Sequence, residues 1–101
     1  MKPLTIYATR GVAEELEDQI PTLRRLLASL FTRHPLDMFV IEPNSDDTIK
    51  IRAAGYSFET NELDEETVLY EGKPALERVV WFKIDDYGRF YVGTFLFPDE
   101  Y

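Results

Sequence analysis

The hydrophobic positions in the first third of the chain follow two periods, one after the other. Leu4, Ile6 and Ala8 alternate with other residues, and this period of two predicts a strand over residues 4–9. After Gly11 the hydrophobic residues recur at every third or fourth position, at Val12, Leu16, Ile20, Leu23, Leu27 and Leu30. That spacing places them on one face of an amphipathic helix, which we expect to end before a proline at position 35.

Pro21 lies in the middle of this predicted helix. Proline has no backbone N–H and therefore removes one hydrogen bond between successive turns. Two arrangements are compatible with it: one helix kinked at Pro21, or a short helix followed by a second helix with Pro21 in its first turn. The unbroken hydrophobic stripe favours the kinked helix.

From residue 36 onward the pattern is typical of strands. Residues 36–42 are apolar almost throughout, as in a central strand covered on both faces, whereas residues 48–53 alternate. The predicted strands are 36–42, 48–53 with a continuation past Gly55 to Phe58, 68–71, and a hairpin of 76–84 and 89–97. We therefore predict a single α+β domain over residues 1–101. Its helix packs on a curved, mostly antiparallel sheet of five to six strands, in the order β-α-β-β-β-β-β.

Both faces of the last predicted strand carry large apolar side chains. Phe90, Val92 and Leu96 point one way, and Tyr91, Phe95 and Phe97 point the other way. We expect the helix to cover one face, and another strand layer or a partner to cover the other. The tyrosines exceed what one small core needs, and tyrosine is enriched at protein contacts; they are Tyr56, Tyr70, Tyr87, Tyr91 and Tyr101.

The amino-acid composition excludes several kinds of functional site. The chain has no cysteine, which excludes disulfides, thiolate nucleophiles and cysteine-based zinc sites. The first residues form a strand pattern without the apolar core of a signal peptide, and no apolar run approaches the roughly 20 residues that span a bilayer. These features predict a cytoplasmic protein that does not enter membranes.

The charge is distributed unevenly. The net charge is −8, yet residues 1–36 carry five basic and four acidic side chains, whereas residues 37–101 carry six basic and fifteen acidic ones. A field of this sign repels nucleic-acid phosphates and anionic lipid headgroups, and it attracts cationic surfaces. We therefore expect no direct binding to nucleic acid or membrane, and a larger basic protein as the partner.

Candidate catalytic groups are few, and each has a structural explanation. His34 is the only histidine, at the predicted helix end, where the helix dipole favours a cation. The run Glu71-Gly72-Lys73 matches half of a metal-dependent nuclease motif but needs a further carboxylate such as Asp64. Neither the aspartate pairs nor the scattered glycines have the spacing of a calcium loop or a phosphate-binding loop. The sequence predicts no catalytic residue, no metal site and no cofactor.

Carboxylates form the strongest binding signal. Five of them lie on one connection, at Glu59, Glu62, Asp64, Glu65 and Glu66, and two predicted turns add Asp46, Asp47, Asp85 and Asp86. Acidic turns on a small domain often serve solubility alone. A row of carboxylates can also imitate the phosphates of nucleic acid and occupy a basic groove, with fast and salt-sensitive association.

We predict a non-enzymatic acidic protein-binding module that docks this negative surface on a basic nucleic-acid-binding protein. Inhibitors of this physical type include anti-CRISPR-like phage proteins and the immunity proteins or antitoxins of bacteria. One alternative is a small enzyme or ligand-binding domain with a pocket between helix and sheet, lined by Trp81, Tyr91 and Phe95, in which His34 or a carboxylate acts. The other is a structural homodimer, formed through the C-terminal hairpin, whose acidity serves only solubility.

Overall fold

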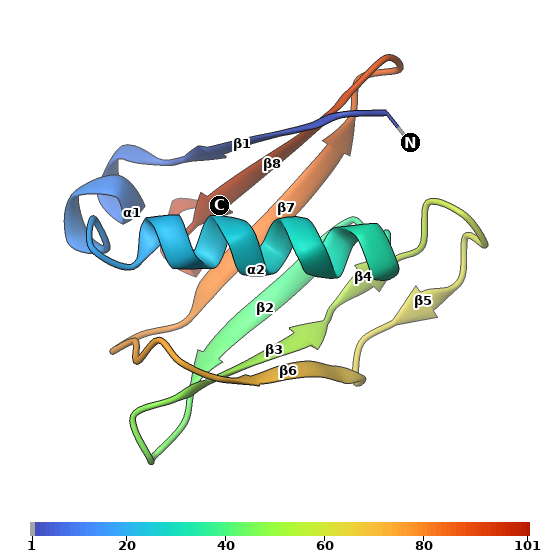
Figure 1. Cartoon of the computed structure of the whole chain (residues 1–101). Coiled ribbons are helices and arrows are strands. Elements are labelled where there is room, and N and C mark those ends of the chain that lie inside the picture. Colours follow the sequence, from blue (N-terminus) through green and yellow to red (C-terminus); the bar gives the residue numbers. More distant parts are fainter. Residues whose placement is uncertain (1) are drawn as a thin grey trace.

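The computed structural model describes residues 2–101 and shows a six-stranded sheet with helices packed on it (Figure 1). In spatial order the strands are β1 (Leu4–Ala8), β8 (Tyr91–Leu96), β7 (Val80–Asp86), β2 (Met38–Pro43), β3 (Ile49–Ala53) and β6 (Val68–Gly72). The pair β1–β8 is parallel, and the other pairs of this sheet are antiparallel. The predicted α+β class and the mostly antiparallel sheet are confirmed.

The chain contains more elements than the predicted order of one helix and six strands. Besides α2 (Ile20–Arg33) there is a short helix α1 (Arg10–Glu15). Strands β4 (Gly55–Tyr56) and β5 (Leu63–Asp64) form a separate two-stranded sheet, and a 3₁₀ turn, η1 (Pro98–Glu100), follows β8. No helix among residues 2–101 is long and apolar enough to cross a bilayer.

The helical segment is divided in two, so the kinked helix favoured by the hydrophobic stripe does not form. Thr9 caps α1, and its hydroxyl oxygen accepts a hydrogen bond from the Val12 N–H at 3.3 Å. The chain leaves the helix at Leu16, and α2 then begins with Pro21 in its first turn, where an N–H has no partner within the helix. The stripe continues because both helices bury their apolar side chains in the same core.

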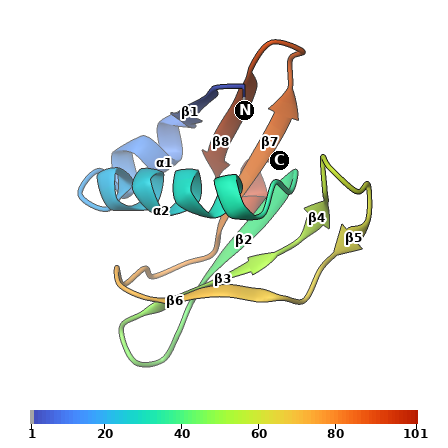
Figure 2. The ribbon, with the colours of Figure 1, turned by 45° about the vertical axis from the view of Figure 1, so that its right-hand side comes forward.

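One face of the sheet packs against the helices and forms the core. Figure 2 shows α1 and α2 on the same side of the sheet. The rings of Phe82 and Phe95 lie 4.5 Å apart, and both side chains are fully buried. Gly93 allows this packing, because a Cβ at that position would overlap the Phe82 ring. Burial of each large apolar side chain of this face contributes about 1.5–3 kcal/mol.

The opposite face of the sheet carries no second layer among residues 2–101. The cross-strand neighbours Val40, Trp81 and Leu96 lie on this open face, with the ion pair of Arg52 and Glu42 beside them. The Tyr101 ring packs edge-on against Trp81, with ring centroids 5.8 Å apart. The expected cover by another strand layer is therefore absent, and cover by a partner stays a prediction.

Several strand boundaries differ from the predicted ones. The predicted continuation of the 48–53 strand past Gly55 to Phe58 is wrong, because β3 ends at Ala53 and Gly55 begins β4, which belongs to the two-stranded sheet. Phe58 does not share a strand face with Tyr56; it lies in a turn and packs on Phe31, with ring centroids 6.1 Å apart. The predicted hairpin is confirmed, although its first strand begins at Val80 rather than at residue 76.

Candidate functional site

The five clustered carboxylates lie on residues 57–67, which we call the acidic segment. Its backbone is ordered by its own polar side chains. The Ser57 hydroxyl oxygen accepts hydrogen bonds from the N–H groups of Glu59 and Thr60, both at 3.1 Å. Asn61 adopts a left-handed conformation with φ of 61°, which asparagine tolerates better than most residues. The segment therefore has a defined shape that its polar side chains maintain.

Asp64 has a structural role within the acidic segment. Its carboxylate accepts hydrogen bonds from the N–H groups of Thr67 at 3.0 Å and Glu66 at 3.1 Å. These bonds, chiefly the one from Thr67, lower the pKa of Asp64. The other four carboxylates are exposed and, among residues 2–101, take part in no ion pair: Glu59, Glu62, Glu65 and Glu66. Their charges are therefore not neutralised by ion pairs within the described residues.

The four aspartates of the predicted turns do not join these free carboxylates. Asp85 is bound by Lys83 at 2.8 Å, and Asp86 by Lys2 at 2.5 Å. The Lys2 ammonium lowers the pKa of Asp86. The remaining two, Asp46 and Asp47, follow the end of β2 that lies away from the acidic segment, as the β2–β3 register shows. The nine predicted carboxylates therefore do not form one surface. Within residues 2–101 the acidic segment brings together four exposed carboxylates without ion pairs, whereas Asp46 and Asp47 are a separate pair.

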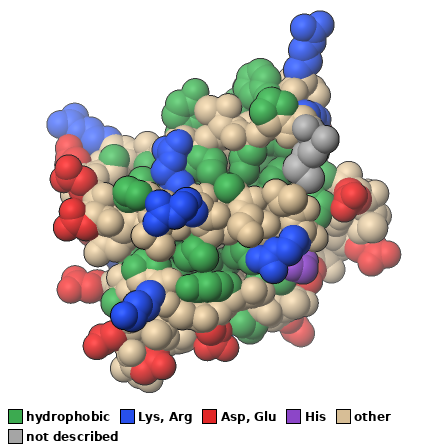
Figure 3. All heavy atoms as spheres, in the orientation of Figure 1, with side chains coloured by type: hydrophobic (Ala, Val, Ile, Leu, Met, Phe, Trp, Pro, Cys, Tyr) green, Lys and Arg blue, Asp and Glu red, His purple; other side chains and the backbone are tan. Residues whose placement is uncertain are grey.

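Basic side chains are found on the helix-covered side of the molecule. Figure 3 shows Lys and Arg side chains in the middle of the helix-covered side and at several of its edges, and Asp and Glu along its margins. Arg24 and Arg25 on α2 are both exposed. His34 caps the C-terminal end of α2 and is half-buried. Neither the Glu71-Gly72-Lys73 run nor any other part of residues 2–101 groups three acidic or histidine side chains that could hold a metal.

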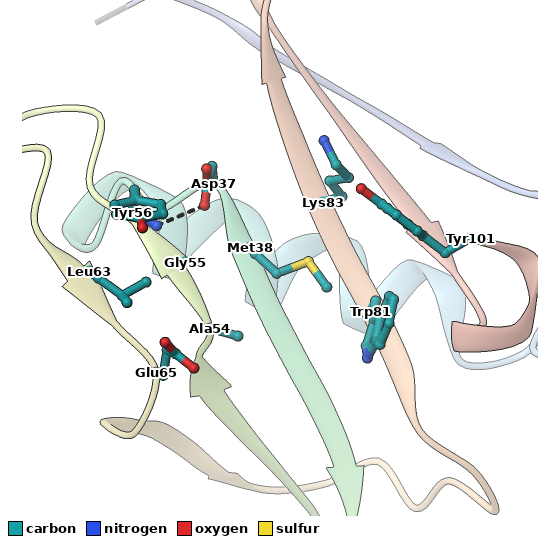
Figure 4. A pocket seen from close by; sticks show the side chains of 10 residues that line it. All are labelled: Asp37, Met38, Ala54, Gly55, Tyr56, Leu63, Glu65, Trp81, Lys83 and Tyr101. Carbon is teal, nitrogen blue, oxygen red and sulfur yellow. Dashed lines mark hydrogen bonds between the residues drawn. The ribbon is translucent and has the colours of Figure 1, made fainter.

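A hollow of about 500 Å³ on the open face adjoins the acidic segment (Figure 4). We call it the trough. Met38 and Ala54 form its floor, and Trp81 and Tyr101 form one wall. Three side chains form the other wall: Tyr56, Leu63 and Glu65. The Tyr56 and Leu63 side chains are 51% and 49% exposed, and Tyr101 is 74% exposed, so the walls present apolar surface to solvent.

The wall that carries Tyr56 is fixed by a close approach of two strands. The Asp37 carboxylate, just before β2, accepts a hydrogen bond from the Tyr56 N–H at 2.8 Å. Gly55 makes the approach possible, since a Cβ there would overlap that carboxylate and lie 2.8 Å from the Met38 nitrogen. The position therefore requires glycine for space, and β4 stays against the start of β2.

The pocket expected between helix and sheet does not form as predicted. Phe95 is fully buried in the core, and Tyr91 packs on the same side against Phe31, with ring centroids 5.0 Å apart. Trp81 lies on the opposite face and lines the trough instead. The sequence held one signal for this: Trp81 and Lys83 occupy alternate positions of the hairpin strand, out of phase with the core residue Phe82.

Comparison of the chain with models of protein families, with curated proteins and with solved structures finds no match. The geometry of the acidic segment and the trough is therefore the basis on which function is inferred.

Proposed function

We propose that the chain is a non-enzymatic protein-binding module that docks the acidic segment and the adjoining trough onto a basic surface of a larger protein. The observation that carries the proposal is the set of four exposed and unpaired glutamates on one short, shaped stretch, beside exposed Tyr56 and Leu63. Charges supply attraction and orientation, and the apolar neighbours supply contact area that is removed from water.

The concentration of negative charge on one short segment supports a partner that normally binds nucleic acid. Clustered free carboxylates can imitate backbone phosphates, and a surface evolved for phosphates carries arginine and lysine. The chain itself is repelled by nucleic acid because its net charge is −8. The module would compete with nucleic acid for the same groove, which is the action of an inhibitor of the anti-CRISPR, immunity or antitoxin type.

The proposal is tested with a charge-reversed variant and a matched control. The variant replaces Glu59, Glu62, Glu65 and Glu66 with Lys. The control makes the same change at four exposed acidic residues outside the acidic segment: Glu17, Asp18, Glu71 and Glu77. Both variants have the same net charge, so a difference between them reports position rather than total charge.

Each protein is used to capture partners from a lysate of the source organism at low and high salt, and a captured basic protein is then purified for a direct titration. We expect the variant to bind at least about tenfold more weakly than the control, and nucleic acid to displace the wild-type protein. Equal binding by variant and control would remove the acidic segment from the interface. A partner that binds nucleic acid and the module together would exclude the inhibitor mechanism.

A further inference from the structure

The trough has two ends of different charge. Lys83 lies at one end, and its ammonium is 2.8 Å from the Asp85 carboxylate, which neutralises it and raises its pKa. Figure 4 shows this ammonium turned away from Trp81 and from Glu65. Glu65 lies toward the other end, on the wall that faces Trp81 across the floor of Met38 and Ala54. That end therefore combines an aromatic wall with an unpaired carboxylate.

The aromatic wall consists of two rings in contact. Figure 4 shows the Trp81 ring close to edge-on, which directs one of its faces across the trough. Behind it, the Tyr101 ring meets Trp81 at an interplanar angle of 69°. Indole has the most negative ring face of the aromatic side chains and attracts cations more strongly than tyrosine or phenylalanine does. The Trp81 ring is thus suited to bind a planar or compact cation that stacks on its face.

The backbone that carries the carboxylate is tied to the open face. The Glu65 carbonyl oxygen accepts a hydrogen bond from the Arg52 guanidinium at 3.0 Å, and Arg52 is in turn bound to Glu42 at 2.8 Å. This chain of contacts ties the acidic segment to the open face of β2 and β3. The Glu65 side chain remains exposed and free of ion pairs among residues 2–101. Its charge lies at the rim of the trough, and the nearby Arg52 guanidinium forms its ion pair with Glu42.

We infer that the trough binds one arginine side chain of the partner protein, stacked on Trp81 and paired with Glu65. This inference rests on the proposed function and identifies the chemical group that the module recognises. Arginine fits better than lysine because its planar guanidinium stacks on an aromatic face while its N–H groups donate to a carboxylate. The methylene stem of the arginine would lie on Met38 and Ala54, the apolar floor of the trough.

The experiment uses the full chain and a peptide of three arginines separated by glycines, with a peptide in which citrulline replaces each arginine as its uncharged counterpart. Trp81 is the only tryptophan of the chain, so its fluorescence reports directly on the trough. We expect the arginine peptide to change this fluorescence in a saturable and salt-sensitive way. The citrulline peptide should bind at least about tenfold more weakly. Equal binding of the two peptides would overturn the inference.

Two glutamate variants locate the site. Glu65→Gln and Glu62→Gln each remove one charge from the acidic segment, but only Glu65 lines the trough. We expect Glu65→Gln to weaken binding of the arginine peptide about fivefold or more, and Glu62→Gln to weaken it by less than about twofold. Equal effects, with unchanged Trp81 fluorescence, would mean that the acidic segment attracts the peptide by charge alone. The inference would then fall while the proposed function stood.

A third variant, Trp81→Leu, removes the ring and is followed by NMR chemical shifts of the Gly55 and Glu65 amides. Its far-ultraviolet circular dichroism and melting curve establish that it folds. We expect the arginine peptide to bind this variant at least about fivefold more weakly. Wild-type-like binding would overturn the stacking role. Failure of the wild-type chain to bind both the arginine peptide and any basic protein would overturn the inference and the proposed function together.

Discussion

The two faces of the six-stranded sheet are built from the same strands and differ in almost every other respect. On the helix-covered face, Phe39, Ile41 and Phe82 have no exposed surface. On the open face, their chain neighbours Met38 and Trp81 are only partly buried, and Lys83 and Arg52 are paired with carboxylates. Because side chains of a strand alternate between faces, one stretch of sequence encodes both the buried, stabilising surface and the surface that we propose for recognition. We therefore expect substitutions at two adjacent positions of a strand to differ, one affecting mainly folding and the other mainly binding.

The sharpest test of this comparison is a pair of adjacent residues, Phe82 and Trp81. Phe82→Ala should lower the free energy of unfolding by about 3–5 kcal/mol, since it leaves a cavity against Phe95. Trp81→Ala should cost about 1–2 kcal/mol, because the ring is partly exposed and no layer packs over it. Urea denaturation monitored by circular dichroism measures both. Comparable losses would show that the open face is part of the core.

The helix that covers the core face offers the next test. Leu27 on α2 is fully buried, so Leu27→Ala should lower the free energy of unfolding by about 2–5 kcal/mol. Arg24 lies on the exposed side of the same helix, and Arg24→Ala should change it by less than about 0.5 kcal/mol. The same denaturation series compares them. A small loss at Leu27 would contradict the orientation of α2 described above.

Gly55 tests the wall of the trough. Gly55→Ala should cost about 1–3 kcal/mol, because the added methyl group overlaps the Asp37 carboxylate and crowds the Met38 backbone. The variant should also displace Tyr56, whose N–H donates to Asp37. Thermal unfolding gives the first result, and the amide chemical shift of Tyr56 gives the second. Loss of stability without a change at Tyr56 would mean that the strain is relieved elsewhere.

The acidic segment should respond to pH through Asp64. Its pKa is lowered in the folded state, so its carboxylate stabilises the fold above the ordinary aspartate pKa near 3.9, and this contribution is lost as the pH falls through the folded value. Asp64→Asn should therefore be less stable than the wild type at pH 7 and should approach it near pH 2. Denaturation curves at a series of pH values measure the difference. A constant difference would contradict a charge-dependent role.

The smallest expected effect comes from the free carboxylates. Glu62→Lys and Glu66→Lys together should change the free energy of unfolding by less than about 0.5 kcal/mol, since both side chains are exposed and form no ion pair among residues 2–101. The same variant should weaken binding to a basic partner. Melting curves and a binding titration separate the two properties. A large loss of stability would indicate that these charges hold the fold.

Local patterns predicted the elements whose hydrogen bonds are local. The C-terminal hairpin followed from two apolar runs on either side of a turn that contains Gly88, which has a positive φ of 88°. The hydrophobic stripe favoured one kinked helix, and this prediction was wrong, because two helices on a common core bury the same stripe. The parallel pairing of β1 with β8 joins residues that are far apart in the chain, such as Leu4 and Tyr91, and no local signal specifies it.

In the candidate site, too, the sequence predicted the features that lie on one segment and missed those that depend on long-range contacts. Composition located the acidic segment, because its carboxylates are neighbours in the sequence. Composition did not distinguish Asp85 and Asp86, which are neutralised by lysines, from Glu65, which is free. The trough was missed because Glu65, Trp81 and Tyr101 come from separate segments and meet only through the order of strands and the final turn.

The pairing of β1 with β8 bears on how the domain is made in the cell. Synthesis runs from the N-terminal to the C-terminal side of a chain, so β1 emerges from the ribosome long before β8, with which it pairs in the six-stranded sheet. Until then β1 has no hydrogen-bonding neighbour at this edge, and the apolar side of α2 lacks the Phe95 surface. We expect the native sheet to close only after synthesis has reached the last strand.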